Sequence, residues 1–247
     1  MMLLVDAGNT RVKWALADAA CAPGAWLHHG AVVHAQLDDA AARWPAAGVT
    51  RALVSNVAGP QLAERIAALL PAGIELEWFA STAQRAGLCN GYREPHRLGC
   101  DRFAAAIGAR ALAPGQDLIV ATCGTATTVD AVTADGRFVG GMILPGLALM
   151  ASSLAGNTAQ LPQVAPGAVP ALFGDNTNDA ILSGVLSAQA GAIERAVAGH
   201  RAAACIVSGG AAPYVAPALK IPHRVVDNIV LVGLQAAATW TEGGAQC

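Results

Sequence analysis

A glycine turn between two strand-like apolar runs occurs twice in this chain. The first copy spans residues 3–18 around Gly8, and the second spans residues 118–136 around Gly124. When Gly8 is placed on Gly124, the turns that follow the second runs fall within one residue of each other. A hairpin tip of glycine and small hydroxyl or amide residues exposes backbone N–H groups that bind anions. The repeat therefore predicts two tips that hold a polyphosphate from both sides.

The length and composition allow two globular domains. The chain has 247 residues, of which 54% are apolar and only 13% charged, and no apolar run approaches the roughly 18 residues that span a membrane. The repeat places the domains at 1–114 and 115–247. Because the N-terminus enters a strand without a basic region and a long apolar segment, we expect no signal peptide and a cytoplasmic location.

Charge and cysteine spacing exclude two classes of function. The formal net charge is −2, and the chain has only two lysines, Lys13 and Lys220, so it has no basic stripe for nucleic acid. None of the six cysteines has the spacing of a zinc site. We therefore expect neither a nucleic acid partner nor structural zinc.

The first half is predicted to contain three strands followed by a helix, a strand, a helix and a strand. Pro60 and Pro71 mark the ends of the second helix. We expect strands at 3–5, 12–16, 26–33, 52–54 and 74–78 and helices at 38–44 and 61–70. This order resembles the RNase H-like fold of the actin, hexokinase and Hsp70 superfamily.

The second half is predicted to repeat this α/β organisation. After a polar loop at 80–100, the expected helices are 101–112, 178–198 and 228–240, and beyond the repeated hairpin the expected strands are 139–144, 204–207 and 223–226. The stretch 156–170 has no periodicity and is long for a structureless loop, which indicates a functional or interface segment. We expect two duplicated RNase H-like domains, each a mixed sheet flanked by helices, with a cleft between them.

Chemistry-bearing residues gather at the first tip. Asp6 ends a buried strand just before Gly8, where a carboxylate commonly holds a hydrated divalent cation beside phosphates. An aspartate that only caps the turn is the structural alternative. Asn9, Thr10 and Lys13 follow at positions able to reach phosphates, Lys13 as a compact point charge.

The second tip offers neutral groups. Residues 124–128 are small enough to let backbone amides approach an anion, and their hydroxyls add donors, although threonine-rich strands are also common for structural reasons. The turn at 208–210 is a third glycine turn, at which a nucleoside could lie against the backbone.

Asp101 lies at the start of a predicted helix, where the helix dipole and unpaired amides keep a carboxylate ionised. This position suits a catalytic base or a plain N-cap. The loop before it carries residues able to hold a small carboxylate or amide substrate, namely Tyr92, Arg93, His96 and Arg97.

Five motifs in this order resemble those of type III pantothenate kinases along the whole chain. They are Asp6-x-Gly-Asn-Thr-Arg-x-Lys13, Gly91-Tyr92-x-x-Pro95-x-x-Leu98-Gly99-x-Asp101-Arg102, Gly124-Thr-Ala-Thr-Thr-x-Asp130, Gly140-Gly-x-Ile-x-Pro-Gly146 and Asn176-Thr177. The resemblance implies ATP-dependent phosphorylation of pantothenate to 4'-phosphopantothenate, the first step towards coenzyme A, on an actin-like fold that works as a homodimer.

The resemblance also implies roles by position. Asp101 would accept the proton, Asp6 would hold Mg²⁺ through water, Thr125 would contact ATP, and Thr177 would act across the dimer interface. The first phosphate loop would comprise Asp6, Ala7, Gly8, Asn9, Thr10, Arg11, Val12 and Lys13. The pantothenate-binding residues would be Tyr92, Gly99, Cys100, Asp101, Arg102 and Thr177.

One position departs from the family. Many relatives carry an aspartate two residues before the second-tip glycine, where it binds a monovalent cation such as K⁺ or NH₄⁺, and this chain has Thr122 there. The usual potassium site is therefore not expected, although a threonine oxygen could still be a weak ligand. Two other functions stay open, a non-catalytic nucleotide-binding regulatory protein of this fold and another small-molecule kinase of the superfamily.

Overall fold

The chain folds into two compact units that are interleaved along the sequence. The computed structural model describes residues 1–18, 20–44, 48–165, 167 and 169–241. Unit 1 contains Met1–Pro114, Gly136–Phe138 and Asn228–Cys247, and unit 2 contains Gly115–Asp135 and Val139–Asp227. Along the sequence, the chain first passes from unit 1 to unit 2 after Pro114. Residues 136–138 and 228–247 were expected in the second domain but group with unit 1.

Unit 1 is built on a five-stranded sheet with the order β3-β2-β1-β4-β5. The central strand β1 is antiparallel to β2 and parallel to β4, and all six of its residues are buried. The expected meander of three strands is confirmed. The strands are β1 (Met2–Ala7), β2 (Arg11–Ala17), β3 (His28–Val33), β4 (Arg51–Asn56) and β5 (Glu75–Trp78).

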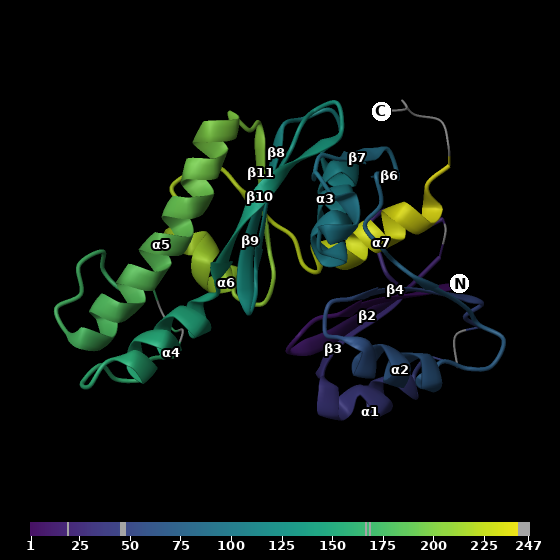
Figure 1. Cartoon of the computed structure of the whole chain (residues 1–247), viewed down its shortest axis with the longest axis horizontal. Coiled ribbons are helices and arrows are strands. Elements are labelled where there is room, and N and C mark those ends of the chain that lie inside the picture. Colours follow the sequence, from purple (N-terminus) through teal and green to yellow (C-terminus); the bar gives the residue numbers. More distant parts are fainter. Residues whose placement is uncertain (19, 45–47, 166, 168, 242–247) are drawn as a thin grey trace. The chain divides into compact units, whose positions relative to one another are not determined.

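Helices cover both faces of this sheet. Helices α1 (Leu37–Ala41) and α2 (Pro60–Leu69) lie on one face, where Trp14, Trp44 and Ile66 join one apolar core, and α3 (Cys100–Leu112) and α7 (Ile229–Thr239) lie on the other (Figure 1). Helices α3 and α7 pack backbone to backbone, because a Cβ at Gly108 or Gly233 would collide with the main chain of the facing helix. A short 3-10 helix, η1 (His34–Gln36), follows β3.

The loop expected at 80–100 contains a small hairpin. Strands β6 (Gln84–Arg85) and β7 (Leu88–Asn90) are joined by Ala86 and Gly87, whose φ angles are +49° and +68°. Two positive φ angles are typical of a type I′ turn, which usually carries Asn-Gly. Because Ala86 occupies the first turn position, the sequence lacks the usual signal for this hairpin. The 3-10 helix η3 (Pro95–Arg97) follows.

Unit 2 contains a sheet whose strands follow the order β12-β11-β8-β9-β10. These are β8 (Leu118–Cys123), β9 (Ala126–Val132), β10 (Arg137–Pro145), β11 (Ala204–Ser208) and β12 (Arg224–Val225). Strand β10 begins with two residues of unit 1, Arg137 and Phe138, which pair with β7.

Helix α5 (Thr177–His200), with the short α6 (Ala212–Val215), covers the sheet face that carries Ile119, Ala121 and Val129. Helix α4 (Leu147–Asn157) lies beside α5 (Figure 1). This helix was not predicted from the sequence, because its residues are mostly small or apolar and form no periodic polar face. In the stretch expected to be irregular at 156–170, residues 166 and 168 lie outside the described residues. Among the helices of the described residues, none is long and apolar enough to cross a membrane.

Candidate active site

At the base of the first hairpin tip, Asp6 and Lys13 face each other across β1 and β2. They are register partners, and Lys13 Nζ lies 3.9 Å from Asp6 Oδ2. Asp6 is only 7% exposed, whereas Asn9 and Thr10 at the tip are exposed. The Gly8 N–H closes the turn by donating to Arg11 O at 3.1 Å. The tip therefore combines a partly buried charge pair at its base with exposed residues at its end.

Burial controls the ionisation of Asp6. Desolvation raises the pKa of its carboxyl to about 6, while the Lys13 charge opposes the shift and the Asp101 charge adds to it. Because burial disfavours the ionised form of this carboxyl, a cation bound beside it would stabilise the carboxylate. The donor set of Asp6 beside an exposed tip fits a magnesium ion that keeps several waters. Within the described residues, no group of three or more His, Cys, Asp or Glu side chains forms a ready metal cluster.

Asp101 is the second residue of α3, two positions after the N-cap residue Gly99. Its Oδ1 accepts a hydrogen bond from Arg102 N–H at 2.8 Å. Burial raises the pKa of Asp101, and the Arg102 N–H bond and the Arg102 and Lys13 charges oppose the rise. Burial therefore outweighs the helix dipole, which by itself would keep this carboxylate readily ionised, as expected from the sequence. Asp101 is consequently a stronger base than an ordinary aspartate.

Cys100 is packed against β4. Its Sγ lies 3.3 Å from Ser55 Oγ and donates to Asn56 O at 3.6 Å. Burial raises the pKa of this thiol. The side chain of Cys100 is therefore fixed against β4 by these two contacts.

Arg102 joins the helix start to the loop at Tyr92. It is 6% exposed, and its Nη1 donates to Tyr92 OH at 2.7 Å. Its guanidinium carbon lies 5.7 Å from the centre of the Tyr92 ring and 5.8 Å from that of Phe138, and these rings meet edge to face. Tyr92 and the turn at 99–102 are thus brought together, as the sequence analysis expected.

The other basic residues of this loop lie at the surface. Arg97 Nε donates to Glu94 Oε2 at 2.6 Å, and His96 Nε2 lies 3.7 Å from the same oxygen. Arg93 is exposed. The loop itself is braced by Asn90, whose side chain donates to Pro95 O and accepts from Tyr92 N–H.

The second tip is closed by backbone contacts from neighbouring glycine turns. Gly124 N–H donates to Ala126 O at 3.0 Å, and Gly146 N–H donates to Thr125 O at 2.9 Å. A Cβ at Gly146 would collide with the Gly124 carbonyl, and a Cβ at Gly209, whose φ is +96°, would collide with the Cys123 carbonyl. These glycines therefore let the chain approach Thr125 and its neighbours closely.

Thr122 lies behind this tip, opposite Thr128. The two are register partners on β8 and β9, and the Oγ1 atom of each is buried without a hydrogen-bond partner in the described part of the chain. Neither atom carries a charge, so this pair lacks the carboxylate that a strong cation site would use.

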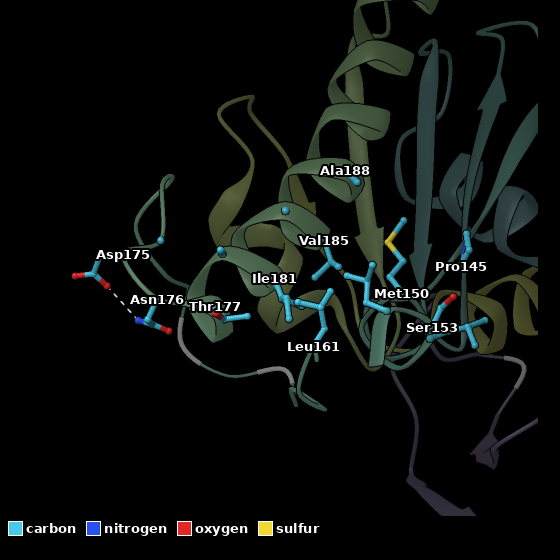
Figure 2. Close-up of a pocket in the computed structure, with 15 residues that line it drawn as sticks. Pro145, Met150, Ser153, Leu161, Asp175, Asn176, Thr177, Ile181, Val185 and Ala188 are labelled. Atoms are coloured by element: carbon cyan, nitrogen blue, oxygen red, sulfur yellow. Dashed lines mark hydrogen bonds between the residues drawn. The ribbon is translucent and has the colours of Figure 1, made fainter. Parts of the chain in front are cut away.

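Thr177 lines an apolar groove in unit 2. The groove has a volume of about 1130 Å³ and lies between α4 and the first half of α5. Figure 2 shows Thr177, Ile181 and Val185 along one side of α5, with Met150 and Ser153 of α4 opposite. At the helix start, Asn176 Oδ1 accepts from Asp179 N–H at 3.0 Å. The motif Asn176-Thr177 is thus an N-cap followed by the first helical residue.

The expected site residues divide between the units. Residues 6–13, Tyr92 and residues 99–102 belong to unit 1, and Thr122, Thr125 and Thr177 belong to unit 2. Sequence reasoning missed His34, Ser55 and Phe138, which contact Gly8, Cys100 and Tyr92. No local pattern marks these three residues, because each contact joins positions at least 26 residues apart.

Comparisons with known proteins identify the family. Residues 2–199 match the family model described as type III pantothenate kinase. A protein of Herminiimonas arsenicoxydans named type III pantothenate kinase is 56% identical over 254 residues, which cover 98% of each chain. The chain belongs to the type III pantothenate kinase family.

Solved structures at lower identity agree with this family in fold. A protein from Campylobacter jejuni, provisionally named a Baf family transcriptional activator, matches with a TM-score of 0.62 at 19% identity, covering 96% of each chain. A glucokinase from an Antarctic psychrotroph matches with a TM-score of 0.53 at 16% identity, covering 95% of this chain and 97% of the other. This family member therefore has the α/β fold of actin-like kinases.

Proposed function

We propose that this protein transfers the γ-phosphoryl group of ATP to the primary hydroxyl of pantothenate. Its family membership supports the reaction. The observation that carries the proposal is the family match over residues 2–199, which includes the facing pair of Asp6 and Lys13 at the first tip and Asp101 in the first turn of α3. Phosphoryl transfer depends mainly on such positioning of charge.

In this proposal, residues 6–13 form the first phosphate loop. Lys13 neutralises phosphate charge, and the exposed amides at the tip donate to phosphate oxygens. Thr125 and the glycine turn around it contact ATP from unit 2. Asp6 holds Mg²⁺ through water, and the ion supplies charge neutralisation on the phosphates.

Pantothenate binds to Tyr92, Thr177 and the turn formed by Gly99, Cys100, Asp101 and Arg102. Because the Cys100 thiol faces β4, this residue contributes its backbone. Arg102 keeps Tyr92 in place, and its positive charge suits the carboxylate of pantothenate. Asp101 orients the attacking hydroxyl and takes its proton as the new phosphate ester bond forms.

The proposed active form is a homodimer in which Thr177 reaches a substrate bound by the neighbouring subunit. The apolar groove between α4 and α5 supports this interface, and exposed Leu149 and Leu154 at the groove are typical of a contact surface. Sedimentation of the purified protein tests the assembly.

We further propose that the kinase works in the cytoplasm, where ATP is available, and that it has no strong potassium site. The neutral pair of Thr122 and Thr128 supports the second point. Titration of activity with K⁺ and NH₄⁺ in sodium-free buffer tests it, and a steep dependence on either ion would contradict it.

One assay tests the reaction itself. The protein is incubated with ATP, Mg²⁺ and pantothenate, and release of ADP is followed, with hexoses in place of pantothenate as the control. We expect ADP release that requires pantothenate. Nucleotide binding without turnover would instead indicate a regulatory protein, and turnover with sugars alone would indicate another kinase of this fold.

A further inference from the structure

We propose that His34 is a positioning residue for the first hairpin tip. Its ring fixes the peptide between Gly8 and Asn9, so that the Asn9 N–H points away from His34 and can donate to an ATP phosphate. The inference rests on the proposed role of residues 6–13 as a phosphate loop and adds to it a residue outside that loop.

The contact is a single hydrogen bond to the tip. His34 Nε2 lies 2.8 Å from Gly8 O. A carbonyl oxygen can only accept, so Nε2 carries the proton and donates. His34 follows β3 directly, and Val33, the last residue of β3, pairs with Arg11 at the start of β2. The sheet register thus brings the ring of His34 to the tip.

The backbone of His34 is held from α2. Arg65 Nη1 donates to the backbone oxygen of His34 at 2.8 Å, and Arg65 Nη2 donates to Asp38 Oδ2 at 2.5 Å. His34 is half-buried as the first residue of η1. Its position therefore depends on packed elements behind the tip and not on the tip itself.

Peptide geometry converts this bond into an orientation of the Asn9 N–H. The described part of the chain contains no cis peptide bond, and in a trans peptide the C=O and the next N–H point in opposite directions. With the Gly8 carbonyl turned towards His34, the Asn9 N–H points away from η1. Asn9 is exposed. The donor is therefore preorganised for an anion.

Unit 2 braces its own tip in a similar way, through backbone N–H donors. Ala211 N–H donates to Cys123 O at 2.9 Å, as Val57 N–H donates to Ala7 O at 3.0 Å in unit 1. The carbonyl of Thr125 receives the Gly146 N–H, whereas that of Gly8 receives the His34 ring. The brace of the first tip can therefore be removed without altering the main chain.

The test compares His34→Ala with His34→Gln, whose side-chain amide can also donate to Gly8 O. In the alanine variant we expect the KM for ATP, and the Kd of a non-hydrolysable ATP analogue measured by calorimetry, to rise about tenfold, as for loss of one hydrogen bond at a preorganised site. The KM for pantothenate should not change. The glutamine variant should recover most of the ATP affinity, and His28→Ala, at an exposed position on β3, is the matched control.

Wild-type ATP affinity in His34→Ala would overturn the proposal. It would also be overturned if His34→Gln bound no better than His34→Ala, or if both substrates were weakened equally with a lower Tm, since that pattern indicates general damage. Absence of pantothenate-dependent ADP release by the wild-type protein would instead refute the proposed function, and the calorimetric comparison would still decide the role of His34.

Discussion

The hairpin tips at Gly8 and Gly124 share their backbone design. In each, the glycine N–H closes the turn, at 3.1 Å to Arg11 O in the first and 3.0 Å to Ala126 O in the second. In each, the carbonyl of the residue before the glycine accepts an N–H from the chain that follows the neighbouring parallel strand. The common backbone indicates one hairpin used twice.

The side chains at the base of the tips differ. The first has the charged pair Asp6 and Lys13, and the corresponding pair in the second is Thr122 and Thr128. The first tip is also one residue longer, because Ala7 pairs with Val12 whereas Cys123 pairs with Thr127. The backbone scaffold can thus be retained while the charged pair at the base of the tip occurs in only one of the two hairpins.

The largest expected effect comes from Asp101, the proposed base. Asp101→Asn should lower kcat by about 100-fold or more, the usual contribution of a general base, because the amide cannot accept the proton. Both tips remain intact, so ATP affinity measured by calorimetry should be unchanged. Near-normal turnover would remove Asp101 from this role.

The next effect concerns the buried charge of the first tip. Because the folded-state pKa of Asp6 is about 6 against an ordinary 3.8, ionised Asp6 costs about 3 kcal/mol of unfolding free energy at neutral pH. The wild type should lose this stability between about pH 4 and pH 6. Asp6→Asn should therefore unfold at a higher Tm than the wild type at pH 8, and at the same Tm at pH 4.

Thermal unfolding without ATP or Mg²⁺ measures this difference. Asp39→Asn, at an exposed position on α1, is the matched control. A difference between Asp6→Asn and wild type that does not vary with pH would show that burial does not shift the ionisation of Asp6.

Lys13 should matter more than either threonine of the second tip. Lys13→Met removes a charge-assisted contact to phosphate and should raise the KM for ATP about tenfold. Thr128→Val should change it much less. The exposed Lys220 is the only other lysine, and Lys220→Met controls for loss of positive charge. Equal effects of the two lysine variants would contradict a specific role for the first tip.

The smallest effect is expected at Thr122. Its Oγ1 is buried without a partner, so Thr122→Val removes an unsatisfied polar group at nearly constant shape. The free energy of unfolding should be unchanged or higher, within about 1 kcal/mol. Denaturant unfolding tests this, and a clear loss of stability would show that the hydroxyl has a function at the second tip.

Sequence patterns predicted the elements that have a continuous apolar run or clear end signals. Strand β1 is buried on both faces and reads as an apolar run, and α2 is bounded by proline. Helix α4 was missed because its small apolar residues show no polar face, and the β6–β7 hairpin was missed because Ala86 occupies a turn position that usually carries asparagine.

The site was predictable where its residues are adjacent in sequence. Asp6 to Lys13 and Gly99 to Arg102 form local motifs, whereas the pairing of Asp6 with Lys13 became apparent only from the strand register. The contacts of His34 with Gly8 and of Phe138 with Tyr92 depend on tertiary packing. The raised pKa of Asp101 likewise reflects its burial in the folded chain, which outweighs the local helix dipole.

The close packing of α7 against α3 has a consequence for biosynthesis. The backbone of α3 meets Gly233 directly, and the first residues of α3 carry Asp101. Helix α7 is the last helix in the described residues, so most of the polypeptide must leave the ribosome before unit 1 can acquire its full set of helices. Unit 2, whose described segments end at Asp227, is synthesised completely before that point. A nascent chain stalled before Asn228 would therefore contain all of unit 2, whereas its unit 1 would lack α7.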